Sequence, residues 1–190
     1  MILTGNSVFF AVSIFYFYAL NFTRIKRMKI SINSKIFPDF KSFEETLNSW
    51  KENKETIVFT NGCFDIVHHG HVDSLIKSAE MGTKLIVGLN DDRSVEILKG
   101  RNRPILSVES RAIVLAAFCF VDAVIIFPEE TPADLIAQIL PDILVKGNQY
   151  KIHEIAGFDT VLAHGGKVET LDLVPGISTS DIIDKIKTLD

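Results

Sequence analysis

Short apolar runs alternate with segments of helical periodicity along most of the chain. Five runs rich in β-branched and aromatic residues are typical of buried parallel strands, at residues 56–60, 84–89, 122–127, 142–147 and 167–171. Apolar positions at helical spacing predict helices at residues 41–54, 70–82, 111–121, 131–140 and 178–189. Strands separated by such helices predict a single-domain α/β fold, a Rossmann-like doubly wound parallel sheet of about five strands.

Local signals mark two of the helix boundaries. Gly82 is placed to end the helix over residues 70–82, because glycine is common just after a helix. Thr131 is expected to cap the helix over residues 131–140, with Pro132 in its first position.

The N-terminal segment differs from the rest of the chain. Residues 1–23 carry no charge and contain VFFAVSIFYFYAL, and four basic residues follow before residue 30. A secretory signal would need a basic region ahead of the apolar run. A membrane anchor would hold the following domain in the cytoplasm. The third interpretation is that translation starts at Met28, and it is favoured narrowly over the membrane anchor. The chain is therefore divided into an apolar extension (1–27), a lead-in with an amphipathic helix (28–53) and a main domain (54–190).

The composition limits the classes of binding partner and indicates the cellular compartment. A formal charge of −4 over 190 residues and an isoelectric point near 5.7 argue against broad binding to nucleic acid. The two cysteines, Cys63 and Cys119, form no metal-ligand pair by spacing and no disulfide framework, which fits a reducing cytoplasm. No metal site made of protein ligands is expected.

The stretch TNGCFDIVHHGH, residues 60–71, gathers an Asp and three of the five histidines between the first strand and its helix. Ligands bind at the carboxyl ends of strands in such sheets, and a helix N-terminus favours phosphate. His68 and His71 stand three apart and could both donate hydrogen bonds to phosphoryl oxygens. Gly70 has no side chain to block a ligand. A zinc pair or a solvated cluster are the alternatives, and Cys63 is read as a small buried residue more readily than as a nucleophile.

Other strand ends supply matching groups. Asn90, Asp91 and Asp92 could bind a hydroxyl or a hydrated cation, or form a turn with a helix cap at Asp92. The remaining groups are a basic loop, a cation beside a glycine and a helix N-terminus. They comprise Lys99, Arg101 and Arg103; Lys146 and Gly147; and Ser178, Thr179 and Ser180.

At these motifs the sequence resembles a known family. GCFDIVHHGH and GISTSDII resemble the HxGH and ISTS-type signatures of the cytidylyltransferase-like nucleotidyltransferases. With NDDRSVEILKGRNRP, VDAVIIFPEETPADLI and PDILVKGNQY, the chain is similar more narrowly to heptose 1-phosphate adenylyltransferases, the nucleotidyltransferase half of bifunctional ADP-heptose synthases. The match covers residues 54–187 and is specific because several motifs occur in order.

The resemblance implies a cytoplasmic enzyme that transfers an adenylyl group from ATP to D-glycero-D-manno-heptose 1-phosphate. The products would be pyrophosphate and ADP-heptose, a precursor of lipopolysaccharide or a related glycan. A magnesium ion would travel with the triphosphate. A separate sugar kinase would supply the sugar 1-phosphate, and a homodimer is expected because the family commonly forms one. Membrane contact would involve residues 1–27.

The resemblance also implies roles for individual residues. His68 and His71 would hold the triphosphate and stabilise transition-state charge, and Lys99 would contact the attacking phosphate or the α-phosphate. Asn90, Asp91 and Asp92 are candidates for the sugar hydroxyls. Nucleotide contacts are implied for Asn61, Gly62, Cys63, Phe64, Asp65, Arg111, Lys146, Gly147, Asn148, Ser178, Thr179 and Ser180.

Two departures from the family pattern keep alternatives open. Gln149 stands in KGNQY where many members have a carboxylate, and LVPGISTS lacks the Arg that related cytidylyltransferases carry ahead of ISTS. One alternative is a CTP-dependent enzyme acting on a polyol phosphate such as glycerol 3-phosphate. The other is a membrane-tethered nucleotide-binding module without turnover.

Overall fold

The computed structural model describes residues 31–149 and 151–189, and residues from Ile32 onward form one compact unit. The interpretations of residues 1–27 lie outside the described part of the chain. Within the described part, no helix combines the length and the apolar character that crossing a bilayer requires.

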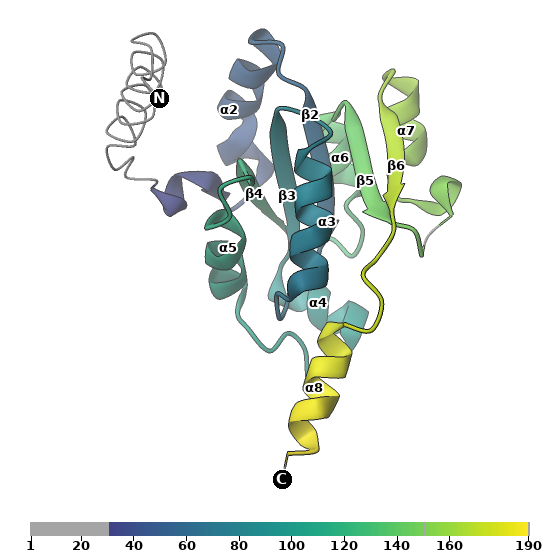
Figure 1. The fold of residues 1–190 in the computed structure, drawn as a ribbon. Coiled ribbons are helices and arrows are strands. Elements are labelled where there is room, and N and C mark those ends of the chain that lie inside the picture. Colours follow the sequence, from purple (N-terminus) through teal and green to yellow (C-terminus); the bar gives the residue numbers. More distant parts are fainter. Residues whose placement is uncertain (1–30, 150, 190) are drawn as a thin grey trace, which may run out of the picture. The chain divides into compact units, whose positions relative to one another are not determined.

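A parallel sheet forms the centre of this unit (Figure 1). Its six described strands are β1 (Ile36–Phe37), β2 (Ile57–Gly62), β3 (Lys84–Asn90), β4 (Ala123–Phe127), β5 (Ile143–Gly147) and β6 (Lys167–Leu171). Their order is β1-β4-β3-β2-β5-β6, and every pairing is parallel. The five expected strands and the doubly wound architecture are confirmed. The sixth, β1, was not predicted because two residues carry no periodicity.

Helices cover both faces of the sheet. They are α2 (Phe40–Glu52), α3 (His69–Ala79), α4 (Asp92–Lys99), α5 (Val108–Ala116), α6 (Ala133–Ile139), α7 (Phe158–Ala163) and α8 (Thr179–Lys187), with 3-10 turns η1 (Ile32–Lys35) and η2 (Ile152–Glu154). One core cluster joins α2, α6 and α7 to the sheet, and a second joins α3 and α5 to it. Figure 1 shows α3 crossing in front of the strands.

Glycine and proline signals misplaced two helix boundaries. α3 ends at Ala79, three residues before Gly82. Gly82 serves close packing instead, because a Cβ there would lie 2.6 Å from the Thr56 carbonyl oxygen. Pro132, not Thr131, occupies the N-cap position of α6, and no side chain caps that helix end.

Serine and aspartate caps determine two other helix starts. α5 begins at Val108 because Ser107 caps it, so Arg111 lies within the first turn instead of opening the helix. The sequence DRSVEILK forms α4, whose cap is Asp91 and not Asp92: the Asp91 carboxylate accepts a hydrogen bond from the Ser94 N–H at 2.7 Å. The helix start expected with its cap at Asp92 is therefore present, but the cap lies one residue earlier and Asp92 is the first helical residue.

A glycine in a central strand leaves room for an aromatic ring from the neighbouring strand. A Cβ at Gly88 in β3 would lie 2.7 Å from the ring of Phe59 in β2, so glycine leaves the space that this fully buried ring fills. Neighbouring positions of β3 are fully buried, as expected of a parallel strand covered on both faces.

The strand order reverses between β2 and β5. From β2 the chain proceeds outward to β3 and β4 on one side, then returns to place β5 and β6 on the other. In doubly wound sheets this switch point opens a crevice outside the carboxyl ends of the strands. The loop that follows β2, and the segments after β3 and β5, all leave this edge. In Figure 1, α4 and the start of α8 lie beyond the same ends.

Candidate active site

The two expected histidines lie together at the carboxyl end of β2. His68 is the N-cap residue of α3 and His71 lies in its first turn. Their rings stack, with centroids 3.9 Å apart and an interplanar angle of 28°. The ring of Phe64 lies against His71 at 5.2 Å, and Phe64 has a backbone φ of 45°, a left-handed conformation that an aromatic residue rarely adopts. His69 is exposed, as expected of a residue outside the pair.

Both histidines are held in the neutral form. Burial, and then the charge of neighbouring His68, lower the pKa of His71 from 6.5 to about 4. Burial and His69 lower the pKa of His68, and the nearby Asp181 carboxylate partly opposes this. Nδ1 of each ring is buried and lacks a hydrogen bond of good geometry among the described residues, although the Ile66 backbone interacts with His71 and partly opposes the lowering of its pKa. Buried polar atoms normally have partners, so these two nitrogens mark a site suited to a polar ligand.

The N-terminus of α8 packs against the histidine turn. Thr179 Oγ1 donates a hydrogen bond to the Ile66 carbonyl at 3.3 Å. A Cβ at Gly70 would lie 3.2 Å from the His68 ring and 3.4 Å from Ile177, so glycine permits this close approach. The ISTS-type segment and the HxGH motif, more than 100 residues apart in sequence, therefore form one surface.

Within that segment the three hydroxyl residues differ in position. Ser178 caps α8: its Oγ accepts from the Asp181 N–H at 3.1 Å and donates to the Asp181 carboxylate at 2.7 Å. Thr179 faces the histidine turn, and Ser180 is exposed. Asp181, which no motif singled out, acts on His68 through its charge.

Lys146 connects the two strands of the switch point. From the end of β5, its Nζ donates to the Asn61 carbonyl oxygen at 3.0 Å and to Asn61 Oδ1 at 2.7 Å at the end of β2. Burial, opposed by Cys63 and assisted by Lys99, lowers the pKa of Lys146 to about 8. Lys146 therefore joins the carboxyl ends of β5 and β2.

The residues after Lys146 lie beside the end of β6. The Asn148 N–H donates to the Leu171 carbonyl at 2.9 Å, and Asn148 Nδ2 donates to Asp172 at 2.6 Å. Gly147 faces Leu173, which a Cβ at position 147 would approach to 3.0 Å. These contacts join the segment after β5 to the end of β6.

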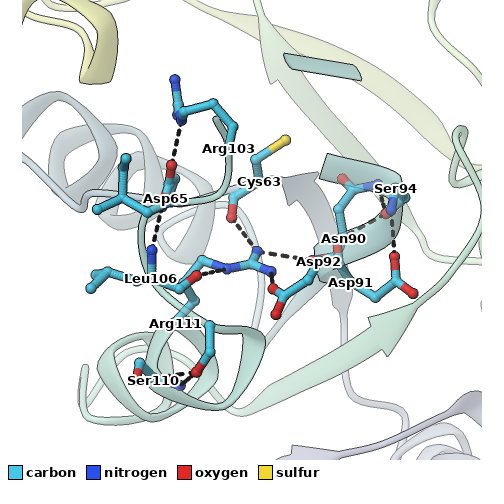
Figure 2. Close-up of polar contacts among 12 residues, drawn as sticks. Cys63, Asp65, Asn90, Asp91, Asp92, Ser94, Arg103, Leu106, Ser110 and Arg111 are labelled. Carbon is cyan, nitrogen blue, oxygen red and sulfur yellow. Dashed lines mark hydrogen bonds and ion pairs between the residues drawn. The ribbon is translucent and has the colours of Figure 1, made fainter. Parts of the chain in front are cut away.

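Arg111, expected near phosphates, is instead fully buried among protein acceptors (Figure 2). Its Nε donates to the Leu106 carbonyl at 3.0 Å, and Nη1 donates to the carbonyls of Cys63 and Asn90 at 2.6 and 2.8 Å. Nη2 pairs with Asp92 at 2.6 Å. Arg111 thus joins the loops that follow β2 and β3.

The predicted sugar-binding turn has intramolecular partners as well. Asn90 is buried, and its Nδ2 donates to Ser94 Oγ and to the Glu129 carbonyl, each at 3.3 Å. Asp91 caps α4, and Asp92 pairs with Arg111 while its side chain remains 46% exposed. Asp92 is therefore the member of the trio whose carboxylate also faces solvent.

Asp65 is buried in the loop after β2 and holds a distant segment. Its Oδ1 accepts from the Ile105 and Leu106 N–H groups at 2.7 and 2.9 Å, and Oδ2 pairs with Arg103 (Figure 2). Burial raises the pKa of Asp65, but the two backbone N–H groups and Arg103 outweigh it, so the pKa lies below its ordinary value. The sequence analysis placed Arg103 in a basic loop but did not predict its ion pair with Asp65. The pair could have been suspected because a carboxylate at the end of a buried strand needs a cation or hydrogen-bond donors.

Four cations act on the loop after β2. Burial raises the pKa of the Cys63 thiol, and Lys99, Arg111, Lys146 and Arg103 oppose the shift through their charges. The thiol is therefore protonated at neutral pH, which favours the reading of Cys63 as a small half-buried residue over that of a nucleophile. Lys99 is the last residue of α4 and is exposed. Positive potential gathers where Asn61, Gly62 and Cys63 leave β2.

Metal ligands do not cluster in the described residues. Across residues 31–149 and 151–189, no three His, Cys, Asp or Glu side chains lie together as a metal-binding group. A magnesium ion fits this site only as a companion of phosphates, coordinated mainly by their oxygens and by water, which is its usual mode with nucleotides.

Comparisons of the sequence with known proteins identify relatives. The sequence model of the family described as cytidylyltransferase-like matches residues 59–185. The bifunctional protein HldE of Campylobacter jejuni subsp. jejuni is 51% identical over 170 residues, which cover 89% of this chain and 35% of that protein. HldE of Pseudomonas fluorescens is 53% identical over 137 residues, 72% of this chain and 29% of that protein. The chain therefore spans about a third of the length of these relatives.

Solved structures show the same fold. The lipopolysaccharide core biosynthesis protein of Thermoplasma volcanium has a TM-score of 0.53 and 26% identity, covering 65% of this chain and 99% of that one. Pantoate-beta-alanine ligase of Francisella tularensis, complexed with beta-gamma ATP and beta-alanine, has a TM-score of 0.54 and 14% identity, covering 80% and 76%. The second likeness concerns the fold alone. From the family match over the strands and both motifs, the chain belongs to the cytidylyltransferase-like family.

Proposed function

We propose that this protein transfers the adenylyl group of ATP to D-glycero-D-manno-heptose 1-phosphate, giving ADP-heptose and pyrophosphate. The observation that carries nucleotidyl transfer is the stacked pair of neutral histidines at the switch point, with Nδ1 atoms that lack a hydrogen bond of good geometry among the described residues. The sugar follows from the motif resemblance and from the identity of about half of the aligned residues with HldE proteins.

In the proposed reaction, a phosphate oxygen of the sugar 1-phosphate attacks the α-phosphorus of ATP. The new phosphorus–oxygen bond forms as the bond to the β-phosphate bridging oxygen breaks, and pyrophosphate leaves with that electron pair. No covalent enzyme intermediate is needed. A magnesium ion held by the phosphates would neutralise part of their charge.

His68 and His71 would act as donors to the phosphates. Because their pKa values are lowered, each imidazole enters the reaction neutral with a single N–H to donate. Donors placed in advance where negative charge develops stabilise the transition state without reorganisation. Lys99, whose charge already reaches Cys63 and Lys146, would approach the attacking phosphate or the α-phosphate.

The remaining site residues would bind and orient. The hydroxyls of Ser178, Thr179 and Ser180 at the start of α8 would bind nucleotide phosphates beside the histidines. Lys146, Gly147 and Asn148 would border the base and ribose. Asp92, with its exposed carboxylate, is the best placed of the Asn90–Asp92 turn to meet a sugar hydroxyl. Arg111 would support the phosphates by fixing these loops, since its donors already contact protein.

The partners follow from this chemistry. A sugar kinase has to make the heptose 1-phosphate, and we propose that it is a separate protein acting earlier. A homodimer and a cytoplasmic location, with membrane contact only through residues 1–27, complete the proposal.

The test is pyrophosphate release by the full chain with magnesium, crossing ATP and CTP with heptose 1-phosphate and glycerol 3-phosphate. Release with ATP and the heptose is expected. Release only with CTP and glycerol 3-phosphate would identify the protein as a polyol-phosphate cytidylyltransferase. Gln149 and the absence of an Arg ahead of ISTS are the two departures from the family pattern that make this test necessary. No release in any pairing would contradict the proposal and favour a nucleotide-binding module without turnover. His153→Gln, at an exposed histidine outside the site, is the matched control for histidine variants.

A further inference from the structure

One buried carboxylate holds the whole segment that follows α4. Asp65 is 2% exposed, and its three partners, Arg103, Ile105 and Leu106, all belong to that segment. These contacts bridge 38 to 41 residues of sequence. A carboxylate that accepts two backbone N–H groups and a guanidinium is fully committed to them, so it serves this segment and not a ligand.

The same segment is held from its other side by Arg111. Leu106 donates its N–H to Asp65 and accepts from Arg111 Nε at 3.0 Å with its carbonyl (Figure 2). Arg111 also contacts the Cys63 carbonyl, two residues before Asp65. Residues 103–106 and the loop after β2 therefore form one hydrogen-bonded unit.

A short basic tip, residues 99–102, consists of the last residue of α4 and the three residues that precede this unit. Lys99 and Arg101 are exposed and take part in no ion pair found among the described residues. Gly100 has a φ of 96°, and a Cβ there would meet no atom within 4 Å. The tip is held at both ends, by α4 with its Asp91 cap and by the Asp65 contacts. The charge of Lys99 acts on Cys63 in the loop after β2.

We propose that Asp65 is a positioning residue, whose carboxylate keeps the basic tip near the loop after β2, so that the cations of the tip meet the phosphates in place. This rests on the proposed function for the identity of the substrates. Arg103 then serves as the partner of Asp65 through its Nε, and Lys99 and Arg101 are the exposed cations of the tip. Ordering the tip in advance lowers the entropy lost when substrate binds.

The experiment compares Asp65→Asn with Asp142→Asn in the full chain. Asp142 is a matched control because its carboxylate also accepts a backbone N–H, that of Ile57 at 2.7 Å, but at the amino end of β2. Two measurements need no turnover: amide hydrogen exchange of residues 105 and 106, and binding of inorganic pyrophosphate by calorimetry. Asp65→Asn should speed exchange at both amides and weaken pyrophosphate binding about tenfold, as expected when binding groups lose their position. Asp142→Asn should change binding less than about twofold.

Turnover separates this proposal from the proposed function. Where wild-type chain is active, Asp65→Asn should raise KM for the sugar phosphate more than it lowers kcat, since position is lost and not chemistry. If wild-type chain is inactive in every pairing, the proposed function fails while the binding and exchange results still decide the positioning role. Unchanged pyrophosphate binding in Asp65→Asn, or equal weakening in Asp142→Asn, would overturn it. If Asp65→Asn does not fold, Arg103→Gln, which keeps both backbone contacts, should still weaken pyrophosphate binding severalfold, and unchanged binding would overturn the proposal.

Discussion

Lowering the pH from 7 to 5 should destabilise the folded chain, in part through His71. Burial and the neighbouring His68 lower the pKa of His71 from 6.5 to about 4. Between these two values the unfolded chain binds a proton that the folded chain does not. His71 therefore has little effect on the free energy of unfolding above pH 7, and it lowers that free energy increasingly as the pH falls from 6.5 toward 4.

The size of the effect follows from proton linkage. With pKa values of 6.5 unfolded and about 4 folded, His71 alone lowers the free energy of unfolding by about 2 kcal/mol between pH 7 and pH 5. The lowered pKa of His68 acts in the same direction. Asp65 contributes nothing in this window, because its stabilisation is lost only below its ordinary value of 3.8. Lys146, with a pKa of about 8, changes charge above the window.

Urea unfolding at pH 7, 6 and 5 measures this loss. The single tryptophan, Trp50, packs against buried Phe43 with ring centroids 5.3 Å apart and reports unfolding by fluorescence. In His71→Gln the side chain cannot titrate, so the loss between pH 7 and 5 should shrink by about 2 kcal/mol relative to the wild type. His164→Gln, at an exposed histidine, should keep the wild-type pH dependence. Identical pH dependence in wild type and His71→Gln would refute the idea that the fold holds this imidazole neutral.

Three further predictions concern catalysis and packing. His71→Ala should lower kcat for pyrophosphate release on the order of 100-fold, because a donor to transition-state charge is removed; His153→Ala is the control, and near wild-type turnover in His71→Ala would contradict the assigned role. Gly88→Ala should lower the free energy of unfolding by about 1–3 kcal/mol, because the added Cβ would lie 2.7 Å from the Phe59 ring; a neutral result in urea unfolding would show that the core has spare room. Arg111→Met should lower the free energy of unfolding by about 3 kcal/mol or more, since it leaves buried carbonyls and a carboxylate without their donor. Thermal unfolding measures this loss, and a loss below about 1 kcal/mol would contradict the role of Arg111 in joining the two loops.

Local sequence pattern was enough to predict the sheet and the position of the histidine pair. Strands such as β3 and β4 are buried on both faces, so their composition alone separates them from helices. The HHGH motif follows such a strand directly, and parallel strands bring their carboxyl ends to one edge. The start of α8 could also be predicted, because Ser178 caps the helix through a local hydrogen bond with the N–H of Asp181, three residues later.

Short elements escaped because they carry little periodicity. β1 has two residues and exists through its pairing with β4, about 90 residues later. α7 is six residues long and packs Val161 into the core, which decides its conformation. Tertiary contacts of this kind outweigh local propensity over so few residues.

The working contacts of the site were decided by tertiary structure alone. Lys146 meets Asn61 across 85 residues, because the strand order places β5 beside β2. Asp65 takes Arg103 as its partner, and Arg111 joins two loops instead of facing the crevice. The sequence identified which groups end at the ligand-binding edge, since that depends on each strand and its own loop. Which of those groups bind one another was settled only by the fold, because a buried charge pairs with whatever the packed chain brings within reach.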